Sequence, residues 1–266
     1  MTPAVTYLFV PGDRPERFAK AMASGAERIV LDLEDAVQPD QKTTARSYIL
    51  DADLDWHRVV VRVNDAASPY FADDLKFLQQ CSAGAVLLPK AEKSEPLKEV
   101  AAACGRAVEL LPLVETARGL ANLPTLLNTE GVSRAVFGHL DFALDLGCSA
   151  DWSSLLFIRA QIVFQSRLAN ALAPIDSITT DIKNADATRA DAQAARQIGF
   201  GGKLLIHPAQ VASVAAAFAP TAEEVTWAKR VLAATGGQAG AVALNGKMID
   251  KPVKEAALRI LARANV

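Results

Sequence analysis

The fold is decided by the stretch Arg28-Ile29-Val30-Leu31-Asp32-Leu33-Glu34-Asp35. It begins as an apolar run without polar alternation, which is typical of a strand that is covered on both faces. It then passes directly into three closely spaced carboxylates. A buried strand that ends in acidic side chains predicts an α/β protein with a polar site at the carboxyl ends of parallel strands.

Similar apolar runs recur along the chain, separated by longer stretches with helical periodicity. The predicted strands are Thr6–Val10, Arg28–Asp32, Val59–Val63, Ala85–Leu88, Glu109–Val114, Ala135–Phe137, Ile175–Thr179 and Lys203–Ile206. The predicted helices include Pro15–Ser24, Lys42–Leu50, Ser94–Cys104 and Asp186–Ile198. Eight strands alternating with helices favour a closed TIM (β/α)₈ barrel over a doubly wound sheet, which would often carry a GxGxxG turn after its first strand.

The end of the chain predicts an appendage to this barrel. We expect the barrel to occupy residues 1–220 and a C-terminal helical extension to occupy residues 221–266. Helical patterns at Ala222–Ala234 and Val253–Ala262 indicate its helices, and a Gly-rich stretch at residues 235–240 indicates a hinge.

Composition excludes several classes of protein. Among 266 residues the formal net charge is −2, and the scattered lysines and arginines argue against a nucleic-acid surface. No apolar run approaches the roughly 20 residues of a membrane helix. Cys81, Cys104 and Cys148 have no metal-ligand spacing and are expected to be reduced thiols. Because the first ten residues do not resemble a signal peptide, we expect a cytoplasmic protein.

Polar or turn-forming residues follow nearly every predicted strand. Barrel active sites are assembled at this end of the strands, from several strands at once. These residues are therefore expected to converge, although they are far apart in sequence. They are Pro11–Arg14; Asp32, Glu34 and Asp35; Arg62 and Asn64; Pro89, Lys90 and Glu92; Glu115; Gly138 and Asp141; Thr180 and Asp181; and His207 and Pro208.

Glu115 and Asp141 form the candidate metal site. Glu115 follows the fifth strand directly, and Asp141 comes a few residues after the sixth, so the two carboxylates are expected to be close enough to share a cation. Two oxygen ligands, with the other positions left to water and substrate, are typical of Mg²⁺. No His or Cys cluster has the spacing of a zinc site. The alternative is that each carboxylate pairs with an arginine or caps a helix.

Arg62 stands within an otherwise apolar strand. A buried arginine needs an anionic partner, and its planar guanidinium fits a carboxylate with two hydrogen bonds. Arg62 could therefore clamp a carboxylate or carbonyl of the substrate. It could equally form a salt bridge to Glu34 or Asp35 inside the barrel.

Lys90 and His207 each allow two interpretations. Lys90 follows the fourth strand, where a desolvated lysine could form the Schiff base of a metal-free aldolase. Glu92 and Glu95 lie nearby and would keep it charged, which favours a structural ion pair. His207 precedes Pro208 and could orient substrate or serve as a hydrogen-bonded structural residue.

Together these motifs resemble the citrate lyase β-subunit-like branch of the HpcH/HpaI aldolase superfamily. Each segment is weak evidence alone, but their order and spacing from the first strand to the eighth are specific. The matching segments are Leu8–Arg14, Leu31–Val37 with Lys42 and Arg46 after it, Val61–Asn64, Leu88–Lys90, Val114–Ala117, Phe137–Phe142 and Gly199–Pro208.

The resemblance implies a TIM barrel that assembles as a trimer or hexamer and acts on acyl-CoA or related thioesters. It implies that Glu115 and Asp141 bind Mg²⁺ and that Arg62 contacts the substrate. Glu34 and Asp35 match acidic residues around the waters of the metal. The Pro11–Arg14 loop, with Arg14, matches a region that lines the entrance for substrate and CoA.

The tail adds a further candidate. Residues 246–252 resemble the C-terminal motif of malyl-CoA and citramalyl-CoA lyase relatives, in which the matching aspartate reaches the active site of a neighbouring subunit. The resemblance thus implies that residues 221–266 form a lid and that Asp250 assists acid–base chemistry. The alternative is that Asp250 caps the last helix. Leu140 departs from the family pattern, because several relatives have glutamate before the metal-binding aspartate.

The reaction expected from these residues is Mg²⁺-dependent cleavage or formation of a C–C bond in a 3-hydroxyacyl-CoA such as citramalyl-CoA or malyl-CoA, with acetyl-CoA and a 2-keto acid as products. One rival is the citrate lyase β-subunit role, in which the thioester sits on an acyl-carrier protein. A second is a metal-dependent aldolase that acts on free 2-keto-4-hydroxy acids. A third is a non-catalytic binding protein on a barrel scaffold.

Overall fold

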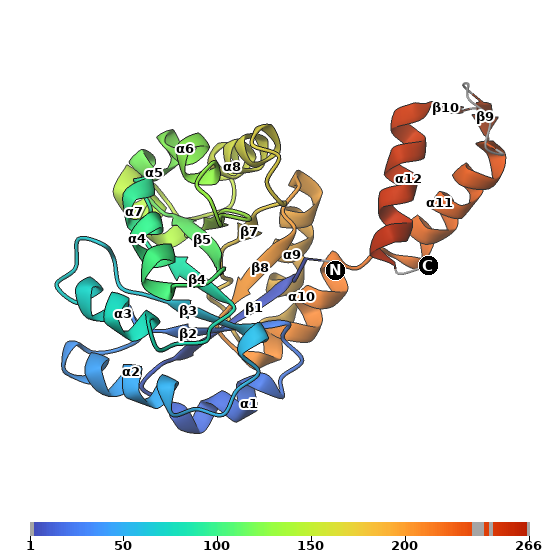
Figure 1. Cartoon of the computed structure of the whole chain (residues 1–266). Coiled ribbons are helices and arrows are strands. Elements are labelled where there is room, and N and C mark those ends of the chain that lie inside the picture. Colours follow the sequence, from blue (N-terminus) through green and yellow to red (C-terminus); the bar gives the residue numbers. More distant parts are fainter. Residues whose placement is uncertain (1–2, 236–241, 245–246, 265–266) are drawn as a thin grey trace. The chain divides into compact units, whose positions relative to one another are not determined.

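A computed structural model describes residues 3–235, 242–244 and 247–264 of the chain (Figure 1). Eight parallel strands form a closed barrel in the order β1-β2-β3-β4-β5-β6-β7-β8, and β8 pairs with β1 to close it. The predicted TIM barrel is therefore confirmed.

The strands follow the apolar runs of the sequence closely. They are β1 (Thr6–Pro11), β2 (Arg28–Asp32), β3 (Val59–Arg62), β4 (Ala85–Leu88), β5 (Glu109–Val114), β6 (Val136–Phe137), β7 (Ile175–Asp176) and β8 (Gly202–Leu205). The predicted bounds of β2, β4 and β5 are those observed, whereas β7 ends three residues earlier than predicted. Every strand contributes a buried side chain to the barrel interior, from Tyr7 on β1 to Leu204 on β8.

Helices lie between the strands and cover the barrel from outside (Figure 1). They are α1 (Phe18–Met22), α2 (Lys42–Leu50), α3 (Phe71–Leu78), α4 (Ser94–Cys104), α5 (Ala117–Ala121), α6 (Leu123–Leu127), α7 (His139–Leu146), α8 (Leu156–Leu168), α9 (Ala185–Ile198) and α10 (Val211–Phe218). The short 3₁₀ helices are η1 (Pro15–Arg17), η2 (Pro39–Gln41), η3 (Trp56–Arg58) and η4 (Pro208–Gln210). The structure splits the helix predicted at Pro15–Ser24 into η1 and α1.

The chain divides into two compact units, of which the first spans residues 3–215 and the second begins at residue 216. The second unit contains α11 (Ala222–Thr235), β9 (Val242–Leu244), β10 (Lys247–Ile249) and α12 (Lys251–Arg263). Its own small core includes Ala228, Val231, Ile249 and Ala257. Apart from Thr235, the predicted hinge at residues 235–240 lies outside the described residues, as does Gly246 of the tail motif.

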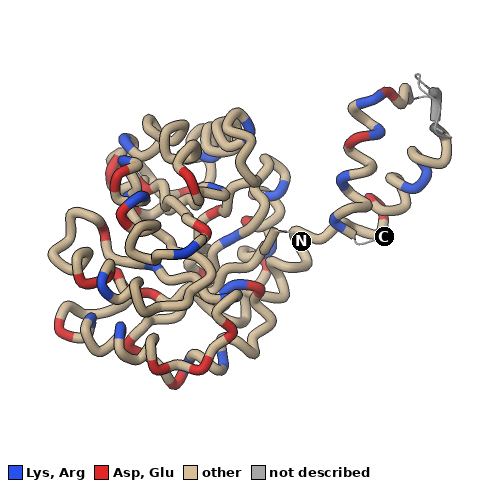
Figure 2. Tube along the Cα trace, viewed as in Figure 1, with Lys and Arg blue, Asp and Glu red and all other residues tan. Residues whose placement is uncertain are grey.

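Charges of both signs are interspersed along the trace of the barrel (Figure 2). In the part of the chain that the structure describes, no helix is both long enough and apolar enough to cross a membrane.

Candidate active site

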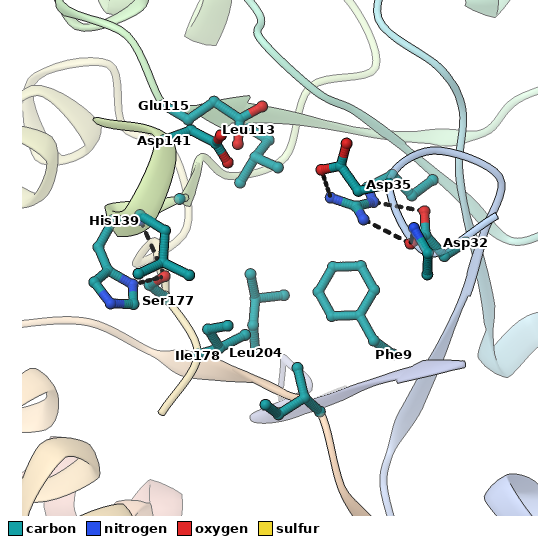
Figure 3. A pocket seen from close by; sticks show the side chains of 15 residues that line it. Phe9, Asp32, Asp35, Leu113, Glu115, His139, Asp141, Ser177, Ile178 and Leu204 are labelled. Atoms are coloured by element: carbon teal, nitrogen blue, oxygen red, sulfur yellow. Dashed lines mark hydrogen bonds and ion pairs between the residues drawn. The ribbon is translucent and has the colours of Figure 1, made fainter. Parts of the chain in front are cut away.

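A cavity of about 350 Å³ opens at the carboxyl ends of the barrel strands (Figure 3). Its lining comes from seven of the eight strands or from the residues that follow them, and β4 is the exception. The lining residues are Phe9, Asp32, Asp35, Ala36, Arg62, Leu113, Glu115, Gly138, His139, Leu140, Asp141, Ser177, Ile178, Leu204 and Ile206. The structure thus places the candidate cavity where the sequence predicts convergence of the strand ends.

Glu115 comes directly after β5 and is only 2% exposed. Its Oε1 accepts a hydrogen bond from the backbone N–H of Lys90 at 2.8 Å. Gly138 allows the close approach of the next strand end, because a Cβ at that position would lie 2.6 Å from Glu115 Oε2. The glycine therefore makes room for the carboxylate at the wall of the cavity.

Asp141 lies in the first turn of α7, which begins two residues after β6. Glu115 and Asp141 lie together at one side of the cavity (Figure 3). Burial, followed by the negative charge of Glu34, raises the pKa of Glu115 to about 8, and Asp141 adds to the effect. Within the described residues neither Glu115 nor Asp141 forms an ion pair. The alternative that each carboxylate pairs with an arginine therefore does not hold for these two residues.

Arg62 ends β3 and lines the same cavity. Its Nε and Nη2 donate to the two carboxylate oxygens of Asp32 at 2.7 and 2.6 Å. Its Nη1 lies 2.9 Å from Glu34 Oε2, an ion pair without hydrogen-bond alignment, and 3.8 Å from Asp35. The guanidinium also stacks over the Phe9 ring at 4.8 Å. Burial would lower the pKa of Arg62, but the charges of Asp32, Glu34 and Asp35 outweigh it and raise the pKa.

The salt bridges expected of Arg62 with Glu34 and Asp35 are therefore present, but its main partner is Asp32. The sequence placed Asp32 among the converging strand-end residues but did not predict that it would be the partner of Arg62. The signal was available, because Asp32 and Arg62 end neighbouring strands and stand opposite each other in register. Asp32 also accepts the backbone N–H groups of Glu34 and Ala36, so it fixes the loop after β2 as well as the arginine.

Lys90 forms an ion pair, but not with the expected neighbours Glu92 and Glu95. Its Nζ donates to Glu34 Oε1 at 2.8 Å, whereas Glu92 pairs with Arg118. Burial would lower the pKa of Lys90, but the hydrogen bond and charge of Glu34 outweigh it and raise the pKa. Because a Schiff-base lysine must lose its proton to react, this contact argues against the metal-free aldolase interpretation.

Lys90 also has a left-handed backbone conformation, with φ at 45°. A non-glycine residue in this region carries strain of about 1–3 kcal/mol and is often found at functional sites. Here the conformation directs the backbone N–H at Glu115 while the side chain reaches Glu34. Lys90 therefore positions the carboxylates of Glu115 and Glu34. Of these two, Glu34 is not among the residues that line the cavity.

Three predicted residues lie elsewhere. The half-exposed Arg14 side chain approaches Asp13 at 3.8 Å and does not line the cavity. His207 Nδ1 accepts the backbone N–H of Ala209 and caps η4, which agrees with the structural interpretation. Asp250 belongs to the second unit, where it is exposed and caps α12 by accepting the N–H of Val253 at 3.3 Å.

His139 and Ser177 line the cavity but were missed from the sequence. Ser177 Oγ lies 2.5 Å from His139 Nδ1 and also accepts the His139 backbone N–H. Burial, followed by the charge of Arg159, lowers the pKa of His139 to about 4. The imidazole is therefore neutral at pH 7. No sequence motif marks this pair, because its partners are 38 residues apart.

A second cavity of about 590 Å³ shares Phe9, Asp32, Ala36 and Ile206 with the first. Its other lining residues include Arg17 and Lys20, and His207 lies at its wall. The two cavities thus form neighbouring spaces, the first rich in carboxylates and the second with two cationic side chains.

Within the described residues no group of three or more His, Cys, Asp or Glu side chains could hold a metal ion. Within the described residues, Glu115 and Asp141 are the two lining carboxylates that form no ion pair, because Asp32 and Asp35 contact Arg62. Such a pair leaves most coordination positions of a hard cation to water and substrate oxygens.

Comparisons with known proteins agree with this geometry. The family model described as HpcH/HpaI aldolase/citrate lyase matches residues 6–208. The chain is 36% identical over 265 residues to a citrate lyase subunit beta-like protein of Mycobacterium tuberculosis, a match that covers 97% of this chain and 94% of that protein. It is 32% identical over 276 residues to a (3S)-malyl-CoA thioesterase of Cereibacter sphaeroides, covering 98% of this chain and 95% of that protein.

Among solved structures, CitE from Mycobacterium tuberculosis in complex with magnesium, acetoacetate and coenzyme A has a TM-score of 0.90 to this chain, with 34% sequence identity. The similarity covers 100% of both chains. From the barrel, the paired carboxylates at its strand ends and these matches, we conclude that the chain belongs to the HpcH/HpaI aldolase/citrate lyase family.

Proposed function

We propose that this protein is a Mg²⁺-dependent lyase that cleaves or forms the C–C bond of a 3-hydroxyacyl-CoA thioester such as citramalyl-CoA or malyl-CoA, with acetyl-CoA and a 2-keto acid as the other partners. The observation that carries the proposal is the pair Glu115 and Asp141, two carboxylates without a cationic partner among the described residues, at the wall of a cavity.

The donor set fits a magnesium ion. Both side chains offer carboxylate oxygens, the ligands that Mg²⁺ prefers, and the cavity leaves space for water and substrate oxygens beside them. The raised pKa of Glu115 fits as well, because a buried carboxylate beside other carboxylates is stabilised in its charged form by a cation. When bound between Glu115 and Asp141, Mg²⁺ would supply Lewis-acid stabilisation of negative charge that develops on substrate oxygens.

Arg62 is the second group that can stabilise developing charge. Its contacts with Asp32 and Glu34 fix the guanidinium in place and leave N–H groups on Nη1 and Nη2 that these carboxylates do not use. A fixed donor at the cavity wall costs no reorganisation during the reaction. Asp35, which is mostly exposed and lines the cavity, can accept hydrogen bonds from water near the metal.

The second cavity supports a thioester substrate. A CoA thioester has an elongated arm that ends in phosphates, and Arg17 and Lys20 provide cations in the space that adjoins the carboxylate-rich cavity. The similar CitE structure, which contains coenzyme A together with magnesium and acetoacetate, supports the same substrate class.

Cleavage leaves an enolate of the acetyl thioester, which needs a proton. We propose that Asp250 of a neighbouring subunit in a trimer or hexamer supplies it, with the second unit acting as a lid. Asp250 is exposed, so its carboxyl group is accessible to solvent, although one oxygen accepts the backbone N–H of Val253 at 3.3 Å.

One rival has support of its own. The chain is 30% identical to a citrate lyase subunit beta of Leuconostoc mesenteroides over 281 residues. In that role the thioester would sit on an acyl-carrier protein, and turnover would require the purified carrier partner.

The test is an assay of the purified protein with citramalyl-CoA, malyl-CoA and a citryl thioester, with and without Mg²⁺. We expect turnover of a CoA thioester that requires Mg²⁺ and is lost in Glu115→Gln and Asp141→Asn. The matched control is Glu109→Gln, at the opposite end of the same strand, where the carboxylate contacts Arg28 and Ser133. Full activity of the Glu115 and Asp141 variants would contradict the proposal.

A further inference from the structure

A serine and a histidine, 38 residues apart in sequence, meet at the wall of the first cavity. Ser177 Oγ lies 2.5 Å from His139 Nδ1 and accepts the backbone N–H of His139 at 3.1 Å. Ser177 and His139 lie on the same side of the cavity as Asp141 (Figure 3). Asp32, the partner of Arg62, lies on the other side. No step of the proposed reaction uses the serine and the histidine.

Ser177 is held firmly in place. Its side chain is fixed by the two contacts with His139, and the residue is only 2% exposed. Its carbonyl accepts a hydrogen bond from Lys203 Nζ at 2.7 Å, and the preceding Asp176 is paired with Arg159 and Lys203. A hydroxyl that is already ordered loses little conformational freedom when a ligand binds to it.

The hydrogen bonds of Ser177 leave one position open. A hydroxyl has one hydrogen to donate and two lone pairs, of which the His139 backbone N–H occupies one. When His139 Nδ1 carries a hydrogen, it occupies the second lone pair, and the Ser177 O–H has no further partner among the described residues. When Nδ1 carries none, it accepts the O–H, and one lone pair stays open. The two states differ in the tautomer of a neutral imidazole and not in charge.

Capping of α7 explains only part of this arrangement. His139 is the first residue of α7, so Ser177 satisfies a backbone N–H group at the start of the helix. Such a cap requires one lone pair and no imidazole. The contact with Nδ1 and the place of both residues at the cavity wall are left without a structural reason.

Hydrogen-bond donors are scarce in this cavity. Among its described lining residues only Arg62, His139 and Ser177 have side chains that can donate, whereas four of the lining side chains are carboxylates. A 2-keto acid that chelates a cation uses its keto oxygen and one carboxylate oxygen, so its second carboxylate oxygen is left to the protein. Without a donor, a charged oxygen beside these carboxylates would be costly to bury.

Resting on the proposed function, we propose that Ser177 donates its O–H to the carboxylate oxygen of the 2-keto acid that the metal leaves free, and that His139 is the positioning residue that donates Nδ1–H to Ser177 Oγ. The hydrogen bonds then run in a chain from His139 through Ser177 to the ligand, and each bond polarises the next. Arg62, on the other side of the cavity, remains available for the charge that develops during the reaction.

The test is a calorimetric titration of the full-length protein at saturating Mg²⁺ with pyruvate and with glyoxylate, the keto acids of citramalyl-CoA and malyl-CoA. We expect Ser177→Ala to bind the keto acid at least about tenfold more weakly than the wild type, because it loses a hydrogen bond to a charged group. The affinities for Mg²⁺ alone and for CoA should not change. The matched control is Ser166→Ala, which removes a buried hydroxyl of α8 that has no hydrogen-bond partner and does not line the cavity.

A double-mutant cycle tests the role of His139. His139→Leu removes Nδ1 and is expected to weaken keto-acid binding at least about fivefold in the wild type, but to have no further effect in Ser177→Ala, because it acts through the serine hydroxyl. His139→Asn places an amide near the position of Nδ1 and should retain most of the affinity. Additive losses in the double variant would show that the histidine does not act through Ser177.

Three further outcomes separate this inference from the proposed function. Wild-type keto-acid affinity in Ser177→Ala would overturn the inference but leave the proposed function standing. An equal loss of Mg²⁺ affinity in Ser177→Ala would also overturn it, because the effect would then belong to the metal site. Failure of the wild type to bind either keto acid at saturating Mg²⁺ would instead contradict the proposed function. Circular dichroism confirms that every variant folds before its affinities are compared.

Discussion

Two clusters of charged residues in the barrel differ in their balance of carboxylates and cations. The closed cluster joins one carboxylate to two cations: Asp176, at the end of β7, contacts Arg159 of α8 at 3.0 Å and Lys203 of β8 at 3.1 Å. The acidic cluster, at the ends of β2 to β6, contains more carboxylates than cations. Its members are Asp32, Glu34, Arg62, Lys90, Glu115 and Asp141.

The difference separates a structural role from a functional one. The side chains of the closed cluster are almost completely buried and pair with one another, and Lys203 also donates to the carbonyl of Ser177, although Arg159 Nη1 has no hydrogen-bond partner. Such a cluster holds the fold and offers nothing to a ligand. The acidic cluster keeps Glu115 and Asp141 unpaired among the described residues at an open cavity, and this imbalance is what a cation would correct.

The largest expected effect on stability comes from breaking the closed cluster. Asp176→Asn removes the one carboxylate and leaves Arg159 and Lys203 buried without it. We expect a loss of about 3–5 kcal/mol in the free energy of unfolding, as for other buried pairs that lose one partner. Urea unfolding of the metal-free protein measures it.

Glu115→Gln provides the contrast in the same experiment. It removes a buried charge that has no cationic partner among the described residues, so metal-free stability should stay the same or rise. If Glu115→Gln lost as much stability as Asp176→Asn, the distinction between the two clusters would be wrong.

Variants of Asp250 test whether the acidic cluster also needs the proton donor proposed from a neighbouring subunit. Asparagine is as good an N-cap as aspartate but cannot transfer a proton, whereas alanine loses the cap as well. We expect Asp250→Asn to slow turnover by about a hundredfold without a change in stability. Asp250→Ala should show the same slowing together with a loss of about 1 kcal/mol in unfolding free energy. Wild-type turnover in Asp250→Asn would leave the residue with its capping role alone.

The two clusters should also respond to pH in opposite directions. The folded pKa of Glu115 is raised from 4.5 to about 8, so its contribution to metal-free stability is fully present below pH 4.5 and is lost as the pH rises to about 8. The slope is at most about 1.4 kcal/mol per pH unit. Burial would raise the pKa of Asp176, but Lys203 and Arg159 lower it, so its contribution is present at neutral pH and is lost on acidification.

Urea unfolding between pH 5 and pH 8 in the presence of EDTA checks this prediction. Stability of the wild type should fall across the window more steeply than that of Glu115→Gln. Parallel curves for the two proteins would show that Glu115 does not titrate as its surroundings require.

Much of this fold follows from local sequence, because a parallel strand buried on both faces must be apolar throughout. This is why the predicted bounds of β2, β4 and β5 are those observed. The end of β7 was harder to predict. After Asp176 the backbone bonds to side chains and not to a neighbouring strand, since the Ser177 carbonyl accepts Lys203 and the Thr179 carbonyl accepts Gln210. Such side-chain contacts leave no periodic signal.

The candidate site likewise has features that follow from the sequence and features that do not. Strand ends predicted which residues converge, including Arg62, Glu115 and Asp141 at one cavity. The ion-pair partner of each charged side chain did not follow from the sequence, because it depends on the directions of side chains across the barrel. Lys90 therefore pairs with Glu34, 56 residues away, and not with its neighbours Glu92 and Glu95.

The most direct test of the central claim is a calorimetric titration of the metal-free protein with Mg²⁺. We expect the wild type to bind one ion per chain, with affinity lost by at least about a hundredfold in Glu115→Gln and in Asp141→Asn, since each removes one of two protein ligands. Glu109→Gln should bind as the wild type does. Unchanged Mg²⁺ affinity in both the Glu115 and the Asp141 variants would contradict the assignment of these carboxylates as the metal site.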